Sequence, residues 1–146
     1  MKRIVFLLVT VAALATGVSA ETRSRWLEIG QNNEGEKIYV DSKTVEYPVY
    51  RDAARKDWVI FWWKVTKHDG SQRVTRFQIK RSTRQSRSLA SVRYSATGEV
   101  TESDSTPTEF IQIIPDTVGE MLCDFFDYVL ADEEKPAPRR STTTNM

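Results

Sequence analysis

The segment from Asp57 to Thr66, with the sequence DWVIFWWKVT, constrains the fold of this 146-residue chain more than any other. Its β-branched and aromatic residues are typical of a β-strand, in which successive side chains point to opposite faces. One face would carry Trp58, Ile60 and Trp62, and the other Val59, Phe61, Trp63 and Val65. A strand that is apolar on both faces is expected to be covered on both. A helix can supply one cover, and a second sheet, a partner chain or a ligand must supply the other.

Shorter apolar segments surround this strand and predict an antiparallel sheet. Asp69-Gly70 directly follows it and is a favoured pair for a tight hairpin turn. Pro48 demotes the Tyr47–Tyr50 segment to an edge strand at most, because proline cannot donate to a β-ladder. The other extended segments are predicted at Arg25–Ile29, Lys37–Val40, Val74–Lys80, Ser88–Tyr94 and Glu109–Ile114, with a polar loop containing Pro107 before the last of them.

A helix is predicted after Pro115. Thr117 and Glu120 have the spacing of a capping box, and an amphipathic run follows from Val118 to Leu130. The predicted apolar stripe consists of Val118, Met121, Leu122, Phe125 and Val129, and the opposite face carries Asp116, Glu120, Asp124 and Asp127. We therefore expect an α+β fold, an antiparallel β-sheet meander with one C-terminal α-helix packed on one face.

The two ends of the chain differ from this domain in composition. Lys2-Arg3, an apolar run and the small residues before Glu21 have the layout of a signal peptide, residues 1–20, cleaved between Ala20 and Glu21. No cysteine near the cut offers a site for a lipid anchor, so we expect no stable membrane anchor and an exported product, periplasmic or secreted, with the cell surface as a further alternative. The folded domain would span residues 21–131, and the polar stretch 132–146 is predicted to be a disordered tail.

Residue counts argue against most enzymatic and metal-dependent functions. One histidine, His68, and one cysteine, Cys123, argue against a structural zinc site, which needs about four soft ligands, and against a catalytic Cys/His pair. No nucleophile or metal-protease motif is present, so we expect no enzyme activity, no cofactor and no metal. The net charge of +1 predicts no nucleic-acid partner. Cys123 is predicted either to fill the core or to bridge two chains.

Charge is unevenly distributed along the sequence. Seven basic and no acidic residues lie between Gly70 and Gly98, and eleven acidic and no basic residues lie between Glu99 and Glu134. Three interpretations stay open: two solvated faces, a polyanion or partner site, or self-association between the basic hairpin of one chain and the acidic helix of another. The predicted binding residues are Arg76, Lys80, Arg84 and Arg87.

The three clustered tryptophans also have two interpretations. Trp58, Trp62 and Trp63 are candidates for an aromatic interface, and burial of at least two of them in the core is the alternative.

Several of these segments, in this order, resemble the bacterial surface-adhesin protein E family from about Trp26 to Leu130. They are Trp26, IYVDSKTV at 38–45, the tryptophan-rich strand at 58–63, the basic run leading into 94–98, and IIPDTVGEML at 113–122. The resemblance implies a small exported α+β domain without enzyme activity that binds host matrix and serum proteins, and it is compatible with a homodimer. The chain departs from the family at Lys80, where members commonly have a cysteine, and Cys123 consequently has no partner.

The function expected from the sequence is therefore that of a non-enzymatic, exported binding protein. Two alternatives remain: a periplasmic structural or interaction module without an adhesin role, and a polyanion-binding module that acts through the basic hairpin.

Overall fold

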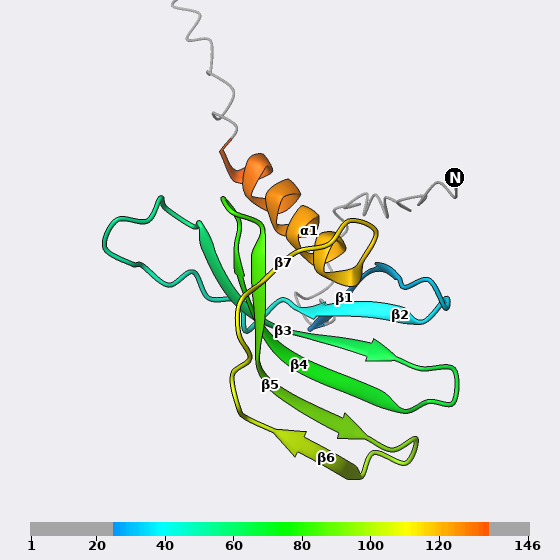
Figure 1. The fold of residues 1–146 in the computed structure, drawn as a ribbon. Coiled ribbons are helices and arrows are strands. Elements are labelled where there is room, and N and C mark those ends of the chain that lie inside the picture. Colours follow the sequence, from blue (N-terminus) through cyan, green and yellow to red (C-terminus); the bar gives the residue numbers. More distant parts are fainter. Residues whose placement is uncertain (1–24, 135–146) are drawn as a thin grey trace, which may run out of the picture.

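A computed structural model describes residues 25–134, which form a seven-stranded antiparallel sheet and one helix (Figure 1). Six strands follow one another in the sheet in chain order, and β7 extends the β5 edge beyond β6. The strands are β1 (Trp26–Gln31), β2 (Lys37–Asp41), β3 (Trp58–Thr66), β4 (Gln72–Lys80), β5 (Gln85–Tyr94), β6 (Val100–Asp104) and β7 (Ile111–Gln112), and the helix is α1 (Val118–Glu133). The predicted α+β meander is confirmed. The predicted signal peptide and its Ala20–Glu21 cleavage site lie outside the described residues.

The predicted Asp-Gly turn joins β3 and β4. Gly70 has a φ of +86°, which suits a residue without a Cβ, and its N–H donates to the carbonyl of Lys67 at 3.0 Å. The Asp69 carboxylate accepts hydrogen bonds from the backbone N–H and hydroxyl of Ser71, at 2.8 and 2.6 Å. This turn fixes the register of the hairpin, in which Trp58 faces Lys80 and Trp62 faces Arg76.

The core lies between the helix and one face of the sheet. The β3 residues on this face are buried, and the ring of Phe61 lies 4.6 Å from that of Phe126 on α1. Helix α1 begins at the predicted cap, where the Thr117 hydroxyl accepts a hydrogen bond from the Glu120 N–H at 3.4 Å. The Glu120 carboxylate accepts from the Asp116 N–H rather than from that of Thr117.

The buried stripe of α1 is rotated from the predicted one. Leu122, Cys123, Phe126 and Leu130 are buried, whereas Phe125 and Val129 are only half-buried. The prediction centred the stripe on Val118, but this residue opens the helix and lies at the end of the interface, so it is a poor reference for the helix axis. Cys123, placed by the sequence at the edge of the stripe, is 0% exposed.

The opposite face of β3 differs from expectation. Trp58, Ile60 and Trp62 are half-buried, and within residues 25–134 no second sheet or helix lies over them. Of the three covers predicted for this face, a second sheet is absent from the described residues, and a partner chain or a ligand stays a prediction. Tyr50 and Phe110, from the loops before β3 and before β7, instead cover Trp58 on this face.

Three elements also differ from the prediction in existence or extent. The stretch predicted as a polar loop before Glu109 contains β6, whose residues are all exposed and so leave no alternating pattern in the sequence. The Tyr47–Tyr50 segment is not a strand, and only Glu46 just before it forms a bridge, with Ile60. Helix α1 continues to Glu133, two residues into the predicted tail, where the Glu133 carboxylate pairs with Lys56.

Candidate functional site

The sheet face that α1 does not cover carries most of the residues singled out by the sequence. We call it the outer face and define it by four β3 residues and their β4 partners: Trp58, Ile60, Trp62 and Lys64, with Lys80, Gln78, Arg76 and Val74. The Lys80 ammonium lies 5.5 Å from the centre of the Trp58 ring. Tyr50 and Phe110 contact the same ring edge-on, at 5.1 and 5.6 Å between ring centres. Trp58 is therefore held in place by its own chain.

Trp62 has no comparable support. It is half-buried, and it makes no hydrogen bond and no ring or cation contact with the residues that the structure describes. Its cross-strand partner Arg76 forms a long ion pair with Glu46, at 3.7 Å. Lys64 lies over the rings of Trp26 and Tyr39, at 4.6 and 5.0 Å, and burial lowers the pKa of its ammonium. Trp62 is the tryptophan of the outer face for which the described chain supplies no ring, cation or hydrogen-bond partner.

The predicted basic residues do not form one cluster. Arg76 and Lys80 lie on the outer face, and Arg87 lies beside it, donating to the Gln78 side chain at 2.8 Å with its guanidinium 4.5 Å from the Phe110 ring. Arg84 lies in the turn between β4 and β5 and donates to Asp124 of α1 at 2.9 Å. All four thus contact other groups of the same chain, and their role in binding stays a prediction.

The basic turn and the acidic helix meet within one chain. Arg84 also pairs with Asp127 at 3.4 Å, and Arg81 donates to the other oxygen of Asp127 at 2.8 Å. Hydrogen bonding to Asp124 raises the pKa of Arg84 above its usual value. The sequence assigned Asp124 and Asp127 to a solvated face, whereas both hold the helix to the turn. The pairing predicted between two chains is formed here inside one.

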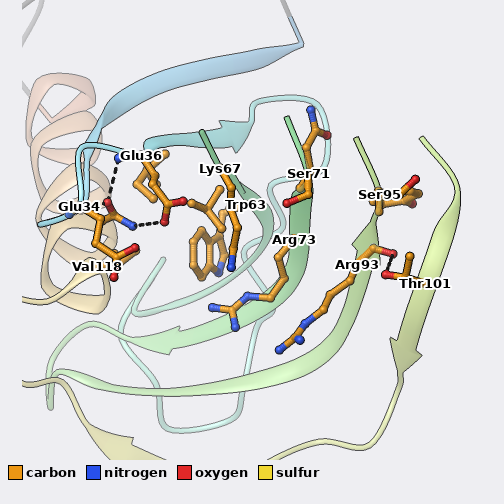
Figure 2. A pocket seen from close by; sticks show the side chains of 15 residues that line it. Glu34, Glu36, Trp63, Lys67, Ser71, Arg73, Arg93, Ser95, Thr101 and Val118 are labelled. Atoms are coloured by element: carbon orange, nitrogen blue, oxygen red, sulfur yellow. Dashed lines mark hydrogen bonds between the residues drawn. The ribbon is translucent and has the colours of Figure 1, made fainter. Parts of the chain in front are cut away.

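A cavity of about 450 Å³ opens on the helix side of the sheet, next to the first residue of α1 (Figure 2). Ile38, Val65 and Val118 give it apolar walls, and Trp63 lines it as well. Trp63 is therefore separated from Trp58 and Trp62, and it lies in the core at 7% exposure with its ring 6.1 Å from Phe77.

Arg73 and Arg93 line this cavity from neighbouring strands. They face each other directly in the β4–β5 ladder, and Figure 2 shows their side chains extending in the same direction. Arg93 pairs with Glu102 at 3.3 Å, whereas Arg73 makes no ion pair or hydrogen bond through its side chain within residues 25–134. The sequence counted both residues in the basic run without distinguishing them, because only the strand register brings them together.

The cavity also has an acidic side. Glu34 and Glu36 come from the turn between β1 and β2, and the Glu36 carboxylate accepts a hydrogen bond from the Asn32 amide at 3.0 Å. In Figure 2, Glu36 and the two arginines lie on different sides of the Trp63 indole. The Trp63 Nε1–H is buried and has no hydrogen-bond acceptor in the described part of the chain.

Both surfaces lie within a region that matches a known family. The model of the family described as surface-adhesin protein E matches residues 26–126, more than two thirds of the chain. The chain belongs to the surface-adhesin protein E family. The match runs from the first residue of β1 to Phe126 in α1, so it includes the whole outer face and every residue that lines the cavity. No curated protein and no solved structure matches this member of the surface-adhesin protein E family.

The described part of this adhesin-family chain offers few reactive groups. Between residues 25 and 134, no three His, Cys, Asp or Glu side chains lie close enough to hold a metal ion. Burial raises the pKa of the Cys123 thiol to about 11, so the thiol is protonated at neutral pH. Of its two predicted roles, the structure favours the buried filler. Over the same range, no helix is long and apolar enough to cross a bilayer.

Proposed function

We propose that this protein is an exported, non-enzymatic adhesin that binds host matrix or serum proteins through its outer face. The observation that carries the proposal is the half-buried Trp62, which lies on the sheet face opposite α1 without a ring, cation or hydrogen-bond partner in the described residues, in a chain of the surface-adhesin protein E family. The signal-peptide pattern of residues 1–20 supports export.

The composition of the outer face suits a protein partner. Tryptophan and arginine are enriched among the residues that dominate binding energy at protein interfaces. Trp62 and Arg76 are neighbours on adjacent strands, and no layer of the described chain covers them. A partner chain or ligand is thus the remaining candidate for the second cover of β3.

A protein partner is better supported than a polyanion at this surface. The side chains of Arg76, Lys80, Arg84 and Arg87 each contact an acidic, amide or aromatic group of their own chain. Binding a polyanion would have to compete with those contacts. A homodimer through the same face is a second possible occupant, and light scattering of the mature protein would detect it.

Binding of the mature protein to immobilised matrix and serum proteins tests the proposal. We expect Trp62→Ala to weaken binding at least tenfold, because truncation of a central tryptophan typically costs about 2 kcal/mol or more. Tyr128→Ala is the matched control, since Tyr128 is 64% exposed on α1, away from the outer face. Equal binding by wild type and Trp62→Ala would contradict the assignment of this face.

Localisation separates the adhesin from the periplasmic alternative. We expect protease treatment of intact cells to remove the protein, and the culture medium to contain any released fraction. Recovery only from the periplasm, in a form protected from protease, would support an interaction module inside the envelope and contradict the adhesin.

A further inference from the structure

We infer that the cavity beside the first turn of α1 is a second recognition site, which binds a carboxylate of a partner protein through Arg73 and Arg93. The inference deepens the proposed function and rests on it, because it assigns the protein partner an acidic segment. The site is on the opposite side of the sheet from Trp62, so the two surfaces can be tested separately.

The positive charges of the two arginines are only partly neutralised by their own chain. Like charges directly opposite each other in a ladder destabilise the pair, and Glu102 neutralises only Arg93. The Arg73 side chain is exposed and makes no ion pair in the described structure. A guanidinium offers parallel N–H donors that match the two oxygens of a carboxylate. An anion between Arg73 and Arg93 would satisfy both.

The indole of Trp63 is a reporter for the same cavity. Trp63 lines the cavity together with the two arginines. Its Nε1–H is fully buried and has no acceptor in the described structure, so a ligand in the cavity does not reach it. A ligand held between the arginines changes the surroundings of the ring, and the indole N–H resonance detects that change without a new hydrogen bond.

The acidic side of the cavity favours a peptide over a sulfated glycan. Glu34 and Glu36 would repel a ligand that carries negative charge along its whole length. A peptide places one carboxylate among neutral amide groups, which can bond to Asn32. The volume of about 450 Å³ lies within the range of sites that hold small ligands or side chains.

The test follows the indole N–H of Trp63 by ¹H–¹⁵N NMR in the whole mature protein. Trp63→Phe identifies its resonance by deletion. The probes are an end-capped octapeptide of glycines with one central glutamate, the same peptide with glutamine for glutamate, and a heparin-derived tetrasaccharide. We expect the glutamate peptide to shift the Trp63 resonance, and Arg73→Gln or Arg93→Gln to weaken its binding about tenfold each, the loss typical of a charge-assisted hydrogen bond.

Arg76→Gln is the matched control, because Arg76 lies on the same strand as Arg73 but on the outer face. It should bind the glutamate peptide as tightly as wild type. Equal binding of the glutamate and glutamine peptides, or binding of the tetrasaccharide alone, would overturn the inference.

The two proposals fail in different ways. If Arg73→Gln/Arg93→Gln retains full binding to matrix and serum proteins, the cavity is not the recognition site, while the adhesin function stands. If wild type binds no such protein but binds the glutamate peptide through Arg73 and Arg93, the carboxylate site stands and the host-protein function fails.

Discussion

Asp41, at the end of β2, is hydrogen-bonded through its carboxylate to Arg25, the first residue that the structure describes. Its side chain is 0% exposed and accepts two hydrogen bonds from the Arg25 guanidinium, at 2.9 and 2.7 Å. Its other oxygen accepts the Lys43 N–H at 3.1 Å. Burial by itself raises the pKa of Asp41, but the bonds from Arg25 and Lys43 outweigh it and leave the pKa below its usual value.

This pair predicts a loss of stability in acid. Because the pKa is lower in the folded state, the stabilisation is complete above the ordinary aspartate pKa of about 4 and is lost as the pH falls through the folded-state pKa. We expect Asp41→Asn to reduce the free energy of unfolding by roughly 1 to 3 kcal/mol at pH 7 and by less at pH 3. Urea unfolding across this pH range measures the difference.

Asp52→Asn provides the comparison for Asp41, since Asp52 is exposed and forms no ion pair or hydrogen bond through its carboxylate in the described chain. It should leave the pH profile of wild type unchanged. A constant difference in unfolding free energy between wild type and Asp41→Asn from pH 7 to pH 3 would contradict the stabilising role of the carboxylate charge.

At the scale of the element, the orientation of α1 decides which phenylalanine supports the fold. Phe126 is 2% exposed and packs on Phe61, whereas its neighbour Phe125 is half-buried. We expect Phe126→Ala to cost about 3 to 5 kcal/mol in unfolding free energy, and Phe125→Ala about half of that or less. Chemical denaturation of both variants gives the ratio. A larger effect at Phe125 would restore the stripe predicted from the sequence.

The long strands were predictable because β-branched and aromatic residues recur along them at strand spacing, although burial alternates strictly only in β3. In β3 the apolar residues fall on both faces, and the predicted partition of Trp58 and Trp62 from Trp63 is the one observed. Strand β6 was missed for the opposite reason, because all five of its residues are exposed. Pairing with β5, a property of the folded sheet, defines it.

The candidate sites were only partly predictable. Period-two alternation places Trp62 and Arg76 on one face once their strands are known, and the sequence identified both. The pairing of Arg73 with Arg93 depends on the β4–β5 register, which includes an irregularity next to Arg76 and Phe77. A shift of the β4–β5 register by one residue would turn Arg93 to the other face of the sheet. No local sequence pattern excludes such a shift.

At the scale of the whole molecule, basic residues of the β4–β5 turn form ion pairs with acidic residues of α1, although the two sets lie far apart in the sequence. Arg84 and Asp124 are 38% and 41% exposed, so their pairing contributes modestly and is sensitive to salt. We expect Arg84→Glu to lower the free energy of unfolding by about 1 kcal/mol in 50 mM NaCl and by clearly less in 1 M NaCl. Urea unfolding at the two salt concentrations measures this.

The control for Arg84 is Arg55→Glu, because Arg55 is exposed and forms no ion pair within residues 25–134. Its stability should follow that of wild type at both salt concentrations. If Arg84→Glu instead leaves stability unchanged and alters the mass measured by light scattering, the charges would act between chains.

The exposed strand β6 also limits how the sheet can grow. Its outer edge has unpaired backbone groups, which would otherwise template the addition of strands from further copies. Glu102 and Asp104 are both on this five-residue edge, and no lysine or arginine accompanies them. Two copies meeting β6 to β6 would bring these carboxylates together, and this repulsion disfavours a dimer in which the sheet continues through that edge.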